Sequence, residues 1–204
     1  MNYPLHLRFK ILTLGNRISI TDQSGALLMY AKQKLFKLKE AISVFGDETQ
    51  TQLKYSISAD RIIDFSANYS FSDAQHKSLG TIRRKGMKSL WKANYEITNP
   101  QTMLMTVTEE NPWAKFFDSL VGELPIIGMF TGYMFHPSYI VKNVQGKELM
   151  RLKKQSAFLE GYYTIDKLDA SLKEHDETSI ILGLFTVVLL ERSRGSVKLN
   201  SYGT

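Results

Sequence analysis

Six basic residues at repeated positions are the side chains whose type and spacing could do the most specific chemistry. They lie at or near the ends of strand-like runs in three similar segments, and residues i and i+2 of a strand share a face, so they should pair on the outside. If these strands lie close together, the cations form a patch that attracts anionic phospholipid or phosphoinositide headgroups, at roughly 1 kcal/mol per basic residue. The simpler alternative is a solvated outer face that also protects strand edges. The candidate anionic-lipid-binding residues are Lys32, Lys34, Arg83, Lys85, Arg151 and Lys153.

Catalytic and metal-binding signatures are absent from the sequence. It contains no Gly-x-Ser-x-Gly elbow, Walker loop, dinucleotide fingerprint or His-Glu-x-x-His motif. The four histidines have no metal-ligand spacing, and the lack of cysteine excludes disulfides and thiolate chemistry. Glu109 and Glu110 are adjacent, so on a strand they would point to opposite faces and could not share acid and base work. We therefore expect no enzyme activity, no metal and no cofactor.

Length and composition are those of one ordinary globular domain over residues 1–204. Of the 204 residues, 43% are hydrophobic and 23% are charged, and no low-complexity linker interrupts them. The first ten residues lack a continuous apolar core and a cleavage site, so we expect a cytoplasmic protein. A net charge of +6 permits anionic partners. Nucleic acid is not expected among them, because no reader motif with interleaved aromatic residues is visible.

A threefold repeat organises the chain into segments that begin at Arg17, Asn68 and Ser138. Each segment contains a strand running into a polar turn, a second strand ending in basic residues and, after a short loop, a third strand. The turns, at residues 22–25, 73–76 and 143–146, begin with Asp or Asn, whose side chains bond their own backbone. With the strand-like runs between segments the total approaches a dozen, which predicts a closed antiparallel β-barrel.

The run from Thr178 to Arg192 predicts a helix that is apolar on every side and must be surrounded completely. At ~1.5 Å per residue it would be about 22 Å long, shorter than the roughly 30 Å core of a bilayer. We therefore expect a central helix at residues 178–192 inside the barrel. Asp176 or Thr178 could cap its start, and Gly195 is placed to end it.

An insertion at residues 111–137 separates the second and third segments and predicts an amphipathic helix. Asn111 and Pro112 can open this helix, and large apolar residues then recur at i, i+3, i+4 and i+7. We expect the stripe to pack on the barrel, with a homodimer interface or a membrane-interface element as the alternatives. The docking-face candidates are Trp113, Phe116, Phe117 and Leu120.

Three features together carry a family resemblance: the run 30–47, the run 139–154 and the enclosed terminal helix. They resemble the tubby C-terminal-like superfamily, most closely its LURP-one-related branch, with phospholipid scramblases as cousins. The resemblance implies a closed barrel of about a dozen strands around a central hydrophobic helix. Tubby domains bind phosphoinositides and scramblases associate with membranes, whereas the LURP-one-related branch has no settled activity.

Function transfers poorly from this resemblance. The tubby phosphoinositide-binding residues have no match here, and Leu168 and Ala170 stand where a calcium loop needs oxygen ligands. We expect a non-catalytic binding or scaffold module that docks at anionic phospholipid or phosphoinositide surfaces. The alternatives are a scramblase-like lipid-translocating membrane protein, and a small-molecule carrier or enzyme that uses the barrel mouth.

Overall fold

The computed structural model describes most of the chain. The described ranges are residues 1–10, 16–33, 41–61, 67–85, 94–100, 103–110, 137–157 and 160–200, with only the backbone at 16, 33, 160 and 192–200. Lys34 and the predicted insertion helix with its aromatic stripe lie outside these residues. The expectations about them stay predictions.

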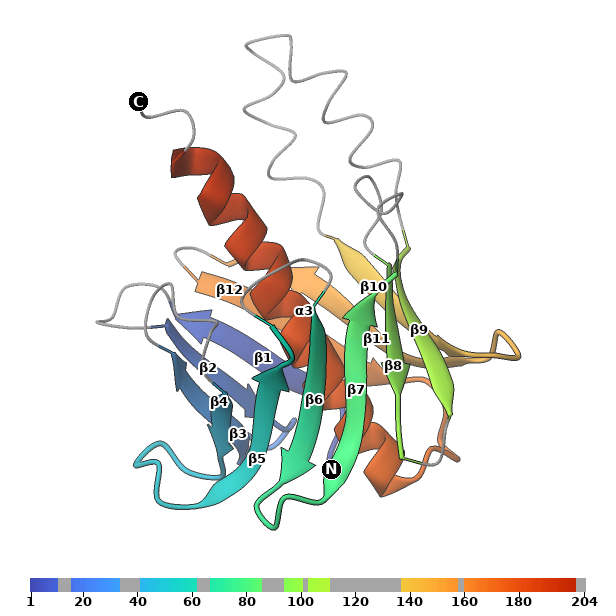
Figure 1. Cartoon of the computed structure of the whole chain (residues 1–204), viewed down its shortest axis with the longest axis horizontal. Helices are drawn as coiled ribbons and strands as arrows, with labels where there is room; N and C mark the ends of the chain where they lie inside the picture. Colours follow the sequence, from blue (N-terminus) through green and yellow to red (C-terminus); the bar gives the residue numbers. More distant parts are fainter. Residues whose placement is uncertain are drawn as a thin grey trace, which may run out of the picture.

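The described residues contain twelve strands and one helix. Consecutive strands pair antiparallel in chain order, and β1 pairs with β12 to close the ring (Figure 1). The predicted fold class, a closed antiparallel barrel around a C-terminal helix, is confirmed. The elements are β1 (Leu5–Lys10), β2 (Asn16–Thr21), β3 (Leu27–Gln33), β4 (Ile42–Phe45), β5 (Leu53–Ala59), β6 (Asn68–Asp73), β7 (Ser78–Arg84), β8 (Asn94–Thr98), β9 (Leu104–Glu109), β10 (Ser138–Asn143), β11 (Glu148–Gln155), β12 (Glu160–Lys167) and α3 (Glu174–Asn200).

The hairpins β2–β3, β6–β7 and β10–β11 share one turn geometry, as the repeat predicts. In each, the first side-chain oxygen of the turn accepts hydrogen bonds from the backbone N–H groups two and four residues later, at 2.9 to 3.0 Å. The fourth residue of each turn has a positive φ, at Gly25 (87°), His76 (61°) and Gly146 (80°). A register shift precedes every one of these turns, so an extra residue is absorbed at the same place in each segment.

Helix α3 fills the barrel and is longer than expected. Every side chain from Asp176 to Leu190 is buried, so the prediction that this segment is surrounded is confirmed. The helix begins at Glu174, so Asp176 and Thr178 lie inside it rather than capping it, and the Thr178 hydroxyl donates back to the Glu174 carbonyl at 3.0 Å. It also continues past Gly195, because one glycine costs a helix only about 1 kcal/mol.

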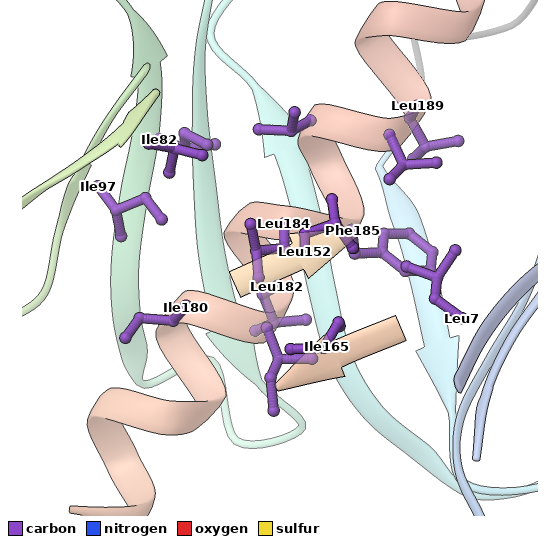
Figure 2. Packing of buried hydrophobic residues seen from close by; sticks show 14 of the residues in the cluster. Leu7, Ile82, Ile97, Leu152, Ile165, Ile180, Leu182, Leu184, Phe185 and Leu189 are labelled. Atoms are coloured by element: carbon purple, nitrogen blue, oxygen red, sulfur yellow. The ribbon is translucent and has the colours of Figure 1, made fainter. Parts of the chain in front are cut away.

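Apolar side chains from opposite walls meet around α3 (Figure 2). Leu7 and Leu152 face the helix from two strands, and Phe185 projects from the helix among them. The helix approaches the wall most closely at Gly183, where an added Cβ would lie only 2.4 Å from the Ile97 Cδ1 atom. The absence of a side chain at this position therefore sets how near α3 packs to β8.

Polar contacts hold the first turn of α3 to one end of the barrel. The Tyr3 hydroxyl donates to Glu177 Oε2 at 2.9 Å, and Lys167 forms an ion pair with the same carboxylate. Asn99 donates its amide to Asp176. Carboxylates in the first turn also complement the helix dipole, so the acidic start both orients and stabilises the helix.

Truncation of Phe185 tests the enclosure of α3, because this side chain is 1% exposed. Phe185→Ala should lower the free energy of unfolding by about 3–5 kcal/mol through lost burial and the cavity left behind. Urea unfolding followed by circular dichroism measures the loss. Val144→Ala, at a site that is 67% exposed, is the control and should change stability by less than about 0.5 kcal/mol. A Phe185→Asp protein that folds as well as the wild type would contradict the enclosed helix.

The repeated turn can be tested at Gly146, where nothing lies within 4 Å of the Cβ that alanine would add. Gly146→Ala should therefore cost about 1 kcal/mol through its left-handed φ alone. Gln145→Ala, one residue earlier in the same exposed turn, is the matched control. Equal midpoints of urea unfolding for the two variants would show that the turn does not impose this backbone conformation.

Candidate anion-binding wall

The three equivalent strands that carry the predicted cations are spread evenly around the ring. Three strands separate β3 from β7, three separate β7 from β11, and three separate β11 from β3. Lys32, Arg83 and Lys153 therefore do not form one patch, because a repeat of four strands places equivalent residues a third of the circumference apart. All three strands run in the same direction, so these residues surround one end of the barrel.

One carboxylate on the neighbouring strand pairs with two of the predicted cations. Arg83 lies opposite Glu96, and both Arg83 Nη2 and Lys85 Nζ contact this one carboxylate, at 2.8 and 2.9 Å. Glu96 itself is only 5% exposed. The hydrogen bonds from Lys85 and then Arg83 outweigh its burial and hold the pKa of Glu96 below the usual value. Two cations share this one carboxylate, so only about one of their two positive charges is left to attract an anion.

Arg151, on β11 a third of the circumference from β7, also pairs with carboxylates. Its guanidinium lies 3.0 Å from Glu110 Oε1 and 3.6 Å from Glu148 Oε2. Lys153, two residues along β11, is exposed and lies opposite Ser138 and Thr164. Of the predicted set, Lys32 and Lys153 are thus the described cations that no carboxylate within the described ranges pairs with.

Lys32 belongs to a row of three cations in register. On neighbouring strands, Lys10 lies opposite Arg17 and Arg17 lies opposite Lys32, and all three side chains are exposed. No ion pair or hydrogen bond joins them to another side chain that the structure describes. Like charges directly opposite each other destabilise a sheet, so folding alone does not favour this row. On the other side of Lys10, the residue opposite it on β12 is Glu160.

Further basic side chains extend the row into a wall. His6 and Arg8 alternate with Lys10 on the outer face of β1, and Lys153 flanks them across β12. Strands β12, β1 and β2 lie side by side on one flank of the barrel (Figure 1). We call this surface the basic wall, and it comprises Lys153, His6, Arg8, Lys10, Arg17 and Lys32.

Sequence reasoning missed Lys10 and Arg17 although a signal was present. The alternation of buried and polar residues in Leu5–Lys10 places His6, Arg8 and Lys10 on one outer face. The pairing of Lys10 with Arg17 follows only once the register of the β1–β2 hairpin is known, and five residues intervene between the two strands. The repeat relates residues at equivalent positions in the three segments, whereas the row consists of residues that are neighbours across paired strands.

Inside the barrel, tyrosine and carboxylate side chains surround the second half of α3. The Tyr95 hydroxyl donates to Glu191 Oε1 at 2.6 Å. Burial and the nearby negative charges of Glu191 and Glu109 raise the pKa of Tyr139 far above its usual value. These groups line a lumen that the helix already occupies. Among the described residues, no three His, Asp or Glu side chains gather in the way that a metal site needs.

A model of the LURP-one-related family matches residues 27–188, from β3 into the buried part of α3. The chain belongs to the LURP-one-related family. The LURP-one-related fold is related to those of tubby-like proteins and scramblases, as the sequence resemblance indicated. Comparison with curated proteins and with solved structures gave no significant match. No stretch of helix that the structure describes is long and apolar enough to cross a membrane.

The role of Glu96 can be tested through the pH dependence of stability. Because its folded pKa is lowered, its stabilising effect is complete above the unfolded pKa of about 4.3 and is lost as the pH falls through the folded value. The difference in free energy of unfolding between the wild type and Glu96→Gln should therefore shrink from neutral pH towards pH 3. Glu148→Gln, at a half-exposed carboxylate, is the control. A difference that does not change with pH would contradict the lowered pKa.

Proposed function

We propose that this LURP-one-related protein is a non-catalytic binding module that docks at anionic phospholipid surfaces through its basic wall. The observation that carries the proposal is the row Lys10, Arg17 and Lys32, three exposed cations placed directly opposite one another. An arrangement that costs folding energy is explained by a ligand that neutralises it. At roughly 1 kcal/mol per basic residue, the row supplies about 3 kcal/mol of attraction to an anionic bilayer.

The shape of the wall supports a surface rather than a single small anion as the partner. Each step between neighbouring strands is about 4.8 Å, so the four steps from Lys153 to Lys32 span roughly 19 Å. Several lipid headgroups fit along such a distance. The role is that of a peripheral protein on the cytoplasmic side of a membrane, with charge as the main attraction and strong dependence on salt.

The scramblase-like alternative is less well supported, because α3 is part of the core. Ile180, Leu184 and Phe185 are each no more than 1% exposed within the barrel. Inserting the helix into a bilayer would require it to leave the barrel and expose the apolar lining of the strands to water. An enzyme or carrier working from the barrel mouth faces the same helix, which occupies the lumen.

Vesicle co-sedimentation tests the docking proposal. The wild-type protein should bind vesicles of phosphatidylserine and phosphatidylcholine, and binding should weaken with salt. The combined change Lys10→Gln, Arg17→Gln and Lys32→Gln should reduce the affinity by roughly a hundredfold, which corresponds to about 3 kcal/mol.

The matched control removes three other exposed cations, with Lys54→Gln, Lys77→Gln and Lys173→Gln. It changes the net charge equally but leaves the basic wall intact, so it should retain most of the binding. An equal loss in both triple variants would assign the attraction to net charge alone, and no binding by the wild type would refute the proposal.

A further inference from the structure

A groove on the outer surface lies at the end of the basic wall away from the row Lys10, Arg17 and Lys32. Its volume is about 300 Å³, which is the lower end of the range for small-ligand sites. Strands β1 and β12 and the turn after β2 form it, outside the barrel. Its lining includes His6, Arg8, Thr21, Asp22, Gln23 and Tyr162.

Arg8 is held in position by the ring of Tyr162. The guanidinium carbon of Arg8 lies 5.1 Å from the ring centroid, and the Tyr162 hydroxyl is 2.8 Å from His6 Nδ1. Stacking on an aromatic ring fixes the plane of a guanidinium, and its N–H groups then suit the paired oxygens of a phosphate or carboxylate. The groove thus contains an oriented cation together with a histidine.

Asp22 adds a carboxylate to the same groove, but its charge is directed into the turn. Its Oδ1 atom accepts hydrogen bonds from Ser24 N at 2.9 Å, Ser24 Oγ at 2.6 Å and Ala26 N at 3.0 Å, and the side chain is buried. Thr21 and Gln23 bring a hydroxyl and an amide to the lining. A bare anion uses only Arg8 and His6, whereas a ligand with hydroxyl groups can also bond to the polar groups around them.

We propose that this groove binds the phosphate monoester of a polyol, with the phosphate against Arg8 and His6 and the hydroxyl groups towards Thr21, Gln23 and Asp22. Such a group occurs in free sugar phosphates and in phosphorylated lipid headgroups. The free form can bind without a membrane, and the row Lys10, Arg17 and Lys32 does not line the groove. Binding at this site can therefore be measured separately from docking.

Isothermal titration calorimetry with glucose 6-phosphate, inorganic phosphate and glucose tests the ligand class. Glucose 6-phosphate should bind most tightly, because it alone offers both the phosphate and the hydroxyl groups. Arg8→Gln should weaken its binding by about tenfold or more, the usual effect of losing a charge-assisted hydrogen bond. Arg8→Lys should recover only part of the affinity, because lysine keeps the charge but neither the planar stacking nor the paired donors.

Two controls separate this site from the docking function. Arg61→Gln removes another exposed arginine, at the end of β5, and should leave glucose 6-phosphate binding unchanged. The triple variant of Lys10, Arg17 and Lys32 should also keep it while losing phosphatidylserine vesicles. A protein that binds glucose 6-phosphate but no phosphatidylserine vesicles would support the groove site and refute docking. A protein that binds these vesicles but not the sugar phosphate would support docking alone.

Vesicles that carry phosphatidylinositol 4-phosphate distinguish the two sources of the ligand. If Arg8→Gln weakens binding of these vesicles more than binding of phosphatidylserine vesicles of equal charge, and glucose 6-phosphate does not bind, the result would support the site and identify a lipid headgroup as its ligand. Binding of glucose 6-phosphate that depends on Arg8 would support a soluble ligand. Insensitivity of both ligands to Arg8→Gln, or equal affinity for glucose and glucose 6-phosphate, would overturn the proposal.

Discussion

The burial of α3 on all sides is the constraint on which the rest of the structure depends. A helix with apolar residues around its whole circumference cannot lie on a sheet, because one face would remain in water. A ring of twelve strands has the converse difficulty, since its lumen must be filled. The two requirements satisfy each other here, and Gly183 allows the helix to approach the wall at Ile97. Helix and barrel are therefore one core.

The sequence was sufficient to predict this architecture but not the surface it creates. Local patterns were enough for the strands, the three Asx turns and the apolar helix, because each depends on residues close together in the chain. The length of α3 was underestimated at both ends, because the polar residues Asp176 and Glu177 look like a start and Gly195 looks like a stop in the sequence. In the structure the two acidic residues are satisfied by Asn99 just after β8, Tyr3 in the segment leading into β1, and Lys167 at the end of β12.

The candidate site also depends on residues that are distant in the chain and become neighbours only in the folded barrel. Lys32 and Arg83 are equivalent in the repeat, yet Arg83 meets Glu96 on the next strand while Lys32 meets Arg17. What decides whether a cation is available is the residue across the ladder, and repeat equivalence carries no information about that residue. Glu96 and Arg17 can both be read in the sequence. That they lie opposite Arg83 and Lys32 depends on strand register, which is a property of the closed ring.

Filling the lumen also leaves the outside of the barrel as the place for the binding that we propose. Inward residues such as Leu7 and Leu152 are committed to packing around α3, and changing them disturbs the core. The outward residues of the same strands, among them Arg8 and Lys10, contribute little to that packing. Successive residues of β1 thus alternate between an inner face that stabilises the core and an outer face to which we assign the proposed binding. Because the faces are separate, the outer surface of a LURP-one-related barrel can change its ligand while the enclosed helix, and with it the fold, stays the same.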